Sequence, residues 1–324
     1  SGLHIQFHFI LNNELPQKHA GVGLARKIGM DEAVRRFEKI KKDGIIVCFD
    51  ADSLCETDYL VELENHFKKN PSTPGCSIYF EHPLSGNEFP AEVYSSIAEY
   101  ELFLRYYKQC LDYCGLPFAF HTIGSSMAVR SSAYQKQGGM NRRKAGEDFY
   151  FLQKIIALGN FSELNSTKVI PSPRPSHRVP FGTGRAISER LNSDEKMMKA
   201  YDFAIFDEIR TFVSLIPGWY EKKKWEKSDE LSDEFNDYLM NEGVEKKWGE
   251  MIQHSSGEKG FYARMFEWFD AFFVLKLVHH LRDVKYPDKP LADMCNLLLN
   301  RKGEMVMNDV KELRIPTTRV IVKA

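Results

Sequence analysis

Two aspartates one residue apart, Asp50 and Asp52, directly follow the apolar run 45–49 and are the first candidates for chemistry in this sequence. A continuous apolar run of this length is typical of a strand that is buried on both faces. Ligands of open α/β sheets bind beyond the carboxyl ends of such strands. Two carboxylates on a tight turn there can bind a divalent cation that also contacts substrate phosphates. The alternative is that one of them caps a helix beginning near Glu56.

A second acidic pair, Glu147 and Asp148, follows Gly146 at the start of a predicted amphipathic helix, residues 147–158. Acidic residues are common in the first turn of helices because they complement the helix dipole, so the pair alone is a weak signal. A glycine turn and strand at residues 124–130 and the Gly138-Gly139 loop come shortly before it. Because glycine lets a ligand approach the backbone closely, this context favours a substrate-facing acid pair.

A third group of candidates is His177 and Arg178, with Arg185 a few residues further on. Arginine side chains can hold phosphate oxygens through two parallel hydrogen bonds, which favours a ligand or phosphate contact. The alternative is a solvated basic loop at the junction between two regions of the chain.

The elements that must position these residues alternate between short apolar runs and amphipathic stretches. We expect strands at 5–10, 45–49, 77–80, 118–121 and 126–130, and helices at 22–42, 57–69, 91–114 and 147–158. This alternation predicts an α/β layer with a mostly parallel sheet. Beyond about residue 185 the sequence predicts mainly helices, and a short strand at 319–323. An apolar stripe there indicates packed core: Met265, Phe266, Phe269, Phe273 and Leu277.

The composition excludes several classes of protein. The 324 residues carry 44 Lys and Arg against 45 Asp and Glu, so we do not expect a nucleic-acid partner. Hydrophobic residues make up 43%, as in an ordinary folded domain, and the most apolar stretch, 261–278, contains four charged residues that argue against a membrane span. Six scattered cysteines argue against a disulfide framework and for a cytoplasmic protein. Cys110 and Cys114, without a second ligand pair nearby, do not predict zinc.

The order of these motifs resembles that of the family 2 glycosyltransferases, which have the GT-A fold. The resemblance covers residues 18–185 and rests on residues 20–27, Asp50-Ala51-Asp52, residues 124–130 with Gly138-Gly139, and Gly146-Glu147-Asp148. It implies a GT-A-like (Rossmann-like) core over residues 1–185, followed by a mainly helical region at 186–324. In that family the Asp-x-Asp carboxylates coordinate Mn²⁺ or Mg²⁺, which bridges the diphosphate of a nucleotide sugar.

The resemblance also implies roles for single residues. Asp52 and Asp50 would bind the metal and the donor, and His177 would add a metal or diphosphate contact. Arg26 and Arg178 would lie on the nucleotide side. Asp148 would be the general base, and Glu147 would orient the acceptor hydroxyl. The implied reaction is inverting transfer of a sugar, of the hexosyltransferase class, from a nucleotide-sugar donor to a saccharide or lipid-linked acceptor, and peripheral membrane contact is compatible with it.

Two other functions compete with this interpretation. Only about forty residues precede the Asp50 strand, so we expect the strand-helix-strand unit that binds the nucleotide base to be missing or shortened. That expectation supports a non-catalytic carbohydrate-binding or scaffolding protein. A phosphohydrolase of the haloacid-dehalogenase type would use Asp50 as nucleophile and Asp52 as acid. Two features disfavour the phosphohydrolase. The residue two positions beyond Asp52 is Leu54, which does not match that family, and no Gly-Asp-x-x-x-Asp sequence follows later in the chain.

Overall fold

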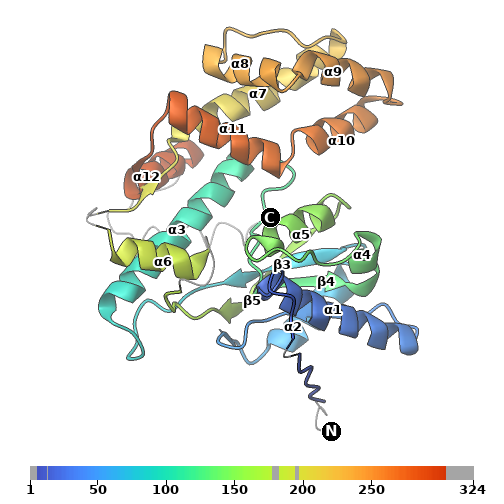
Figure 1. The fold of residues 1–324 in the computed structure, drawn as a ribbon. Coiled ribbons are helices and arrows are strands. Elements are labelled where there is room, and N and C mark those ends of the chain that lie inside the picture. Colours follow the sequence, from blue (N-terminus) through green and yellow to red (C-terminus); the bar gives the residue numbers. More distant parts are fainter. Residues whose placement is uncertain (1–5, 13, 177–181, 194–196, 304–324) are drawn as a thin grey trace. The chain divides into compact units, whose positions relative to one another are not determined.

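The computed structural model describes residues 6–12, 14–176, 182–193 and 197–303, and these divide into two compact units (Figure 1). The first unit comprises residues up to 80, residues 122–172 and residues 176–185. The second comprises residues 81–121, residues 173–175 and the chain from 186 onward. The expected strand at 319–323 lies outside the described residues.

The first unit is built on a five-stranded sheet in the order β1-β4-β3-β5-β2. Its strands are β1 (Ile45–Cys48), β2 (Leu54–Cys55), β3 (Gly75–Phe80), β4 (Met127–Arg130) and β5 (Ser162–Ile170). Only β3 and β5 pair in parallel, and the other three neighbouring pairs are antiparallel. The expected mostly parallel sheet is therefore wrong, and the sheet is mixed. An apolar strand buried on both faces has the same residue pattern in either direction, so the sequence could not reveal that β4 is reversed.

Helices pack on both faces of this sheet. Adjacent residues of a strand point to opposite faces. The Cys48 sulfur lies 3.7 Å from that of Met30 in α1 (Val22–Lys39). The next residue, Phe49, contacts Tyr59 of α2 (Tyr59–Lys69), with ring centroids 5.8 Å apart. On the first face α1 also packs against α4 (Ser131–Lys136) and α5 (Glu147–Ile156). The predicted α/β class is thus confirmed.

Two of the expected strands do not form. Residues 6–10 are not part of a strand, and their apolar side chains are exposed. Residues 118–121 are not in a strand, because the chain turns at residues 117–118, where the amides of Ala119 and Phe120 donate to the carbonyls of Leu116 and Phe118. Phe118 and Ala119 are buried there, so their apolar character reflects core packing and not strand structure.

The second unit is mainly helical. It contains α3 (Ala91–Tyr113) and a two-stranded pairing of β6 (Lys199–Ala200) with β7 (Lys289–Pro290). Its remaining helices are α7 (Phe203–Glu221), α8 (Asp233–Asn241), α9 (Val244–Gln253), α10 (Glu258–Trp268), α11 (Ala271–Val284) and α12 (Leu291–Lys302). Helix α6 (Thr183–Leu191) runs through the division at residue 185. The domain boundary after residue 185 stays a prediction, and α3 packs with α7 and α12 of the helical unit.

Aromatic side chains form much of the core of the second unit. Phe269 is fully buried, and its ring centroid lies 4.8 Å from that of Phe212 and 5.1 Å from that of Phe273. Met265 and Leu277 are fully buried as well, so the predicted apolar stripe is core, with Phe266 only half-buried. Within the described ranges, none of the helices has the length and apolar character needed to cross a membrane.

Candidate active site

The end of β1 and the start of β4 meet at one edge of the sheet. Cys48, the last residue of β1, pairs with Met127, the first residue of β4, in an antiparallel register. Asp50 lies two residues beyond β1, and Gly124 lies three residues before β4. Because antiparallel neighbours run in opposite directions, both residues emerge at the same edge. The first candidate carboxylate therefore lies beside the glycine turn that the sequence singled out.

Arg26 connects this edge to the second acidic pair. It lies in the second turn of α1, and its Nη2 donates to Asp50 Oδ1 at 2.8 Å. Its Nη1 donates to Glu147 Oε1. Only 12% of the Arg26 side chain is exposed. Burial by itself lowers the pKa of Arg26, but the charges of Asp50 and Glu147 outweigh it and raise that pKa, so the guanidinium stays charged.

Gly124 makes room for this guanidinium. A Cβ at Gly124 would overlap the guanidinium of Arg26 and would lie only 2.8 Å from its Nη2. The backbone amide of Gly124 donates to Asp148 Oδ2 at 2.8 Å. Gly124 thus serves the site twice, as an open space for Arg26 and as a hydrogen-bond donor to Asp148.

Helix α5 begins at the second acidic pair. Its N-cap is Gly146, with φ 64°, a left-handed conformation that glycine adopts easily. Glu147 and Asp148 follow in the first turn, where the positive end of the helix dipole favours carboxylates. Asp148 Oδ1 also accepts the Phe149 amide at 2.8 Å, so both of its oxygens are held.

Burial raises the pKa of both acids. Glu147 is only 3% exposed, and its pKa is raised by burial first and by the charge of Asp148 second. Burial likewise raises the pKa of Asp148 above 3.8, against the opposing effects of Arg26 and of the amides of Phe149 and Gly124. A carboxylate with a raised pKa is a better proton acceptor, and such groups cluster at active sites.

Asp52 lies on the exposed turn after β1. The Ser53 amide donates to the Asp50 carbonyl at 3.0 Å, which closes the turn. Helix α2 begins later than expected, at Tyr59, and Asp58 is its N-cap. The alternative that Asp50 or Asp52 caps this helix is therefore wrong, and neither carboxylate is explained by helix capping.

The Asp-x-Asp turn fits a hard divalent cation in its donor type. Carboxylate oxygens are the ligands that Mg²⁺ and Mn²⁺ prefer, and such ions take their remaining ligands from water and substrate phosphates. In the described part of the chain, no three His, Cys, Asp or Glu side chains are grouped to hold a metal by themselves. A metal at this turn would need further ligands besides Asp50 and Asp52, such as water or a phosphate. His177 and Arg178, the other predicted ligands, lie outside the described residues.

Two cysteines lie at the C-terminal end of α3, Cys110 within the helix and Cys114 at its C-cap. Cys110 and Cys114 are both buried, and burial raises the pKa of each thiol well above its usual range. Zinc binds thiolates, so burial disfavours the form of these side chains that would hold a metal, and the absence of zinc stays a prediction.

Two contacts of the site have no counterpart in the sequence motifs. The motif resemblance implies only a nucleotide-side position for Arg26, whereas its guanidinium bridges Asp50 and Glu147. Gly124 belongs to the predicted turn, and its close contact with Arg26 is visible only in the structure. Both features depend on segments about a hundred residues apart, and no local pattern signals them.

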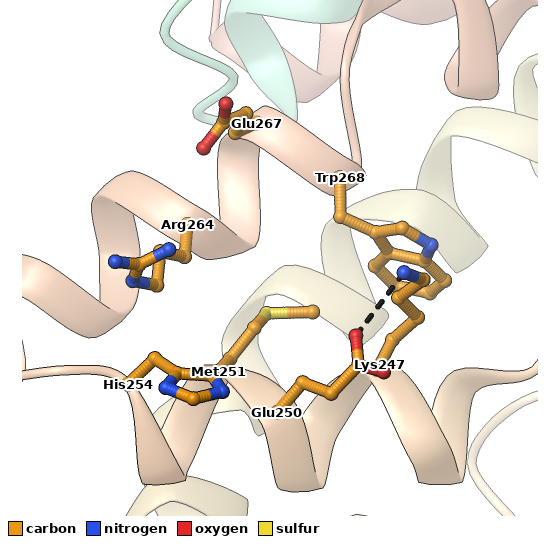
Figure 2. A pocket seen from close by; sticks show the side chains of 7 residues that line it. All are labelled: Lys247, Glu250, Met251, His254, Arg264, Glu267 and Trp268. Atoms are coloured by element: carbon orange, nitrogen blue, oxygen red, sulfur yellow. Dashed lines mark hydrogen bonds and ion pairs between the residues drawn. The ribbon is translucent and has the colours of Figure 1, made fainter.

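The second unit contains a hollow in its surface, shown in Figure 2. It measures about 300 Å³ and lies between α9 and α10. Its walls mix charged and apolar side chains: Lys247, Glu250, Met251, His254, Arg264, Glu267 and Trp268. Lys247 Nζ donates to Glu250 Oε2 at 3.2 Å within the same helix. Both of these side chains are more than two-fifths exposed.

No model of a known protein family matches this sequence, and no curated protein matches it. The function of the chain must therefore be inferred from the chemistry of the site and from the order of its motifs.

Proposed function

We propose that this chain is a metal-dependent, inverting glycosyltransferase with a GT-A-like core in its first unit. One observation carries the proposal. Four segments that are distant in sequence bring Asp50, Glu147 and Asp148 together around Arg26 and Gly124 at one sheet edge. The exposed carboxylates, Asp50 and Asp52, suit a metal and a donor diphosphate. The acids at the start of α5, whose pKa values are raised by burial, suit proton transfer.

Asp50 and Asp52 would hold Mn²⁺ or Mg²⁺, which when bound would neutralise charge on the departing diphosphate. Asp148 accepts the proton of the acceptor hydroxyl as that oxygen bonds to the anomeric carbon and the bond from this carbon to the diphosphate oxygen breaks. The amides of Gly124 and Phe149 fix the orientation of the Asp148 carboxylate. Displacement from the opposite face inverts the anomeric configuration.

The proposed donor is a nucleotide sugar, and the proposed acceptor is a hydroxyl of a saccharide or of a lipid-linked saccharide. A cytoplasmic location and peripheral contact with a membrane are parts of the same proposal. They are compatible with described helices that are too short or too polar to span a bilayer.

The experiment is a calorimetric titration of UDP and of GDP into the chain, with and without Mn²⁺. We expect one nucleotide to bind only with Mn²⁺, and Asp52→Asn to weaken this binding at least about tenfold, because a metal ligand is lost. Glu38→Gln is the matched control. Glu38 is an exposed carboxylate on α1 in the same unit, away from the Asp-x-Asp turn, and its removal should leave binding unchanged.

Binding that is unaffected by Mn²⁺ or by Asp52→Asn would contradict the proposed metal site. Absence of binding by either nucleotide, together with binding of free saccharides, would favour the non-catalytic carbohydrate-binding alternative.

A further inference from the structure

We propose that Arg26 is a resident cation of the site, which competes with the divalent metal for Asp50 and keeps metal affinity low until a donor diphosphate is present. The inference rests on the proposed function for the identity of the metal. It assigns to Arg26 a role different from the nucleotide contact that the motif resemblance implies.

The first support is the bond that a metal must displace. Arg26 Nη2 holds Asp50 Oδ1 at 2.8 Å, so one oxygen of a predicted metal ligand already faces a positive charge. A cation bound to Asp50 would lie next to this guanidinium, and like charges at such a distance repel. Metal binding is therefore opposed unless the Arg26–Asp50 bond opens or added negative charge, such as a diphosphate, offsets the repulsion.

The second support is the difference in burial between the two ends of the bridge. The Glu147 side chain is 3% exposed, whereas that of Asp50 is 43% exposed. Breaking the bond to Glu147 is costly because a buried carboxylate is left without its partner, whereas Asp50, when released, is exposed enough to be solvated by water. Arg26 can therefore release Asp50 to an incoming ligand while it remains bound to Glu147.

The third support is that the backbone accommodates the guanidinium specifically. Gly124 has no side chain where Arg26 lies, and any Cβ there would overlap the guanidinium. Arg26 is thus held within the site and is not a mobile surface side chain that happens to reach an acid. Its one formal positive charge meets the three formal negative charges of Asp50, Glu147 and Asp148. The cluster therefore still attracts a dication, and it would attract one more strongly without Arg26.

The test measures Mn²⁺ binding to the full chain without any nucleotide, from the electron paramagnetic resonance signal of free Mn²⁺. We expect Arg26→Gln to bind Mn²⁺ about three- to tenfold more tightly than the unsubstituted chain. Arg26→Lys should lie between the two, because an ammonium keeps the charge but lacks the planar fork that bridges two carboxylates. The matched control is Arg36→Gln, which removes a positive charge from the same helix, where Arg36 pairs with Glu32. It should leave Mn²⁺ affinity unchanged.

Equal or weaker Mn²⁺ binding by Arg26→Gln, or no binding by either protein, would overturn the inference, and weaker binding would mean that Arg26 positions Asp50 for the metal. Circular dichroism shows whether Arg26→Gln is folded. If it is not, the comparison of Arg26→Lys with the unsubstituted chain decides the matter, with tighter binding again expected. Failure of UDP and GDP to bind any of these proteins would contradict the proposed transferase but would not alter the outcome of the nucleotide-free comparison.

Discussion

The sheet edge of the first unit and the α9–α10 hollow of the second unit both gather charged side chains, but they do so differently. At the sheet edge, four segments far apart in sequence gather three carboxylates around one buried arginine, and one of these carboxylates, that of Glu147, is buried as well. In the hollow, two consecutive helices present mostly exposed charges, and the Lys247–Glu250 pair lies within a single helix turn. A hollow alone is thus a weaker sign of chemistry than buried charges that a fold assembles from distant segments.

The energetic reason lies in solvation. An exposed ion pair contributes between nothing and about 1 kcal/mol, so the pair in the hollow needs no explanation by function. Burying Glu147 costs stability, because burial disfavours its charged form and raises its pKa. A fold that keeps Glu147 buried against Arg26, beside an Asp148 held by two backbone amides, is typical of a functional site.

The largest expected effect is that of Asp148→Asn on sugar transfer. We expect the rate of nucleoside diphosphate release from nucleotide sugars to fall by about 10²- to 10⁴-fold, because the proposed general base is lost. Nucleotide binding should persist, since an asparagine oxygen can still accept the Gly124 amide. Glu250→Gln, which neutralises an acid of the hollow instead, should transfer sugar normally, and an equal loss in both variants would erase the distinction between the two regions.

The second unit should respond most strongly to loss of its aromatic core. Trp248 is 1% exposed and its ring centroid lies 4.9 Å from that of Phe261. Trp248→Ala should lower the free energy of unfolding by about 3–5 kcal/mol, because it leaves a large cavity. Urea denaturation followed by tryptophan fluorescence measures this, since all four tryptophans lie in the second unit. A cost below about 1 kcal/mol would contradict the packing described for this core.

A smaller effect is expected at Gly124. Gly124→Ala should lower stability by about 1–3 kcal/mol, since the added methyl group displaces the Arg26 guanidinium. It should also weaken Mn²⁺-dependent nucleotide binding. Gly29→Ala is the matched control, because Gly29 lies in α1 with no atom near the position of an added Cβ, and alanine favours the helix there. Urea denaturation followed by circular dichroism compares the two, and equal stability in both variants would mean that the close contact at Gly124 is unimportant.

The smallest effect is expected for the ion pair of the hollow. Lys247→Gln should change the free energy of unfolding by no more than about 0.5 kcal/mol, because both partners are largely exposed. The same fluorescence-detected denaturation measures it. A cost of several kcal/mol would place this pair in the same class as the Arg26 bridge.

Local sequence features were enough to locate the acids of the candidate site. The run 45–49 predicted a strand that ends at Asp50, and Gly146-Glu147-Asp148 predicted the start of α5. Both signals are local, since an apolar run of strand length and a glycine followed by acidic residues are patterns of neighbouring residues. The burial of β1 was not predicted correctly, because its residues alternate between half-buried and buried.

The features that the sequence could not reveal depend on contacts between distant segments. Strand β4 is reversed relative to expectation, and its direction is fixed by pairing with β1 and β3 and not by its own residues. The bridge from Arg26 to Asp50 and Glu147 requires three segments to meet. The packing of α3 with the C-terminal helices likewise has no local signal.

Hydrogen exchange of the full chain, with and without Mn²⁺ and either UDP or GDP, tests most directly whether the ligand binds at the sheet edge of the first unit. We expect slower exchange of amides at residues 49–53, 122–126 and 146–149, and no change at residues 244–268. Slower exchange at residues 244–268, with the sheet edge unchanged, would contradict this expectation and would place the ligand site in the helical unit.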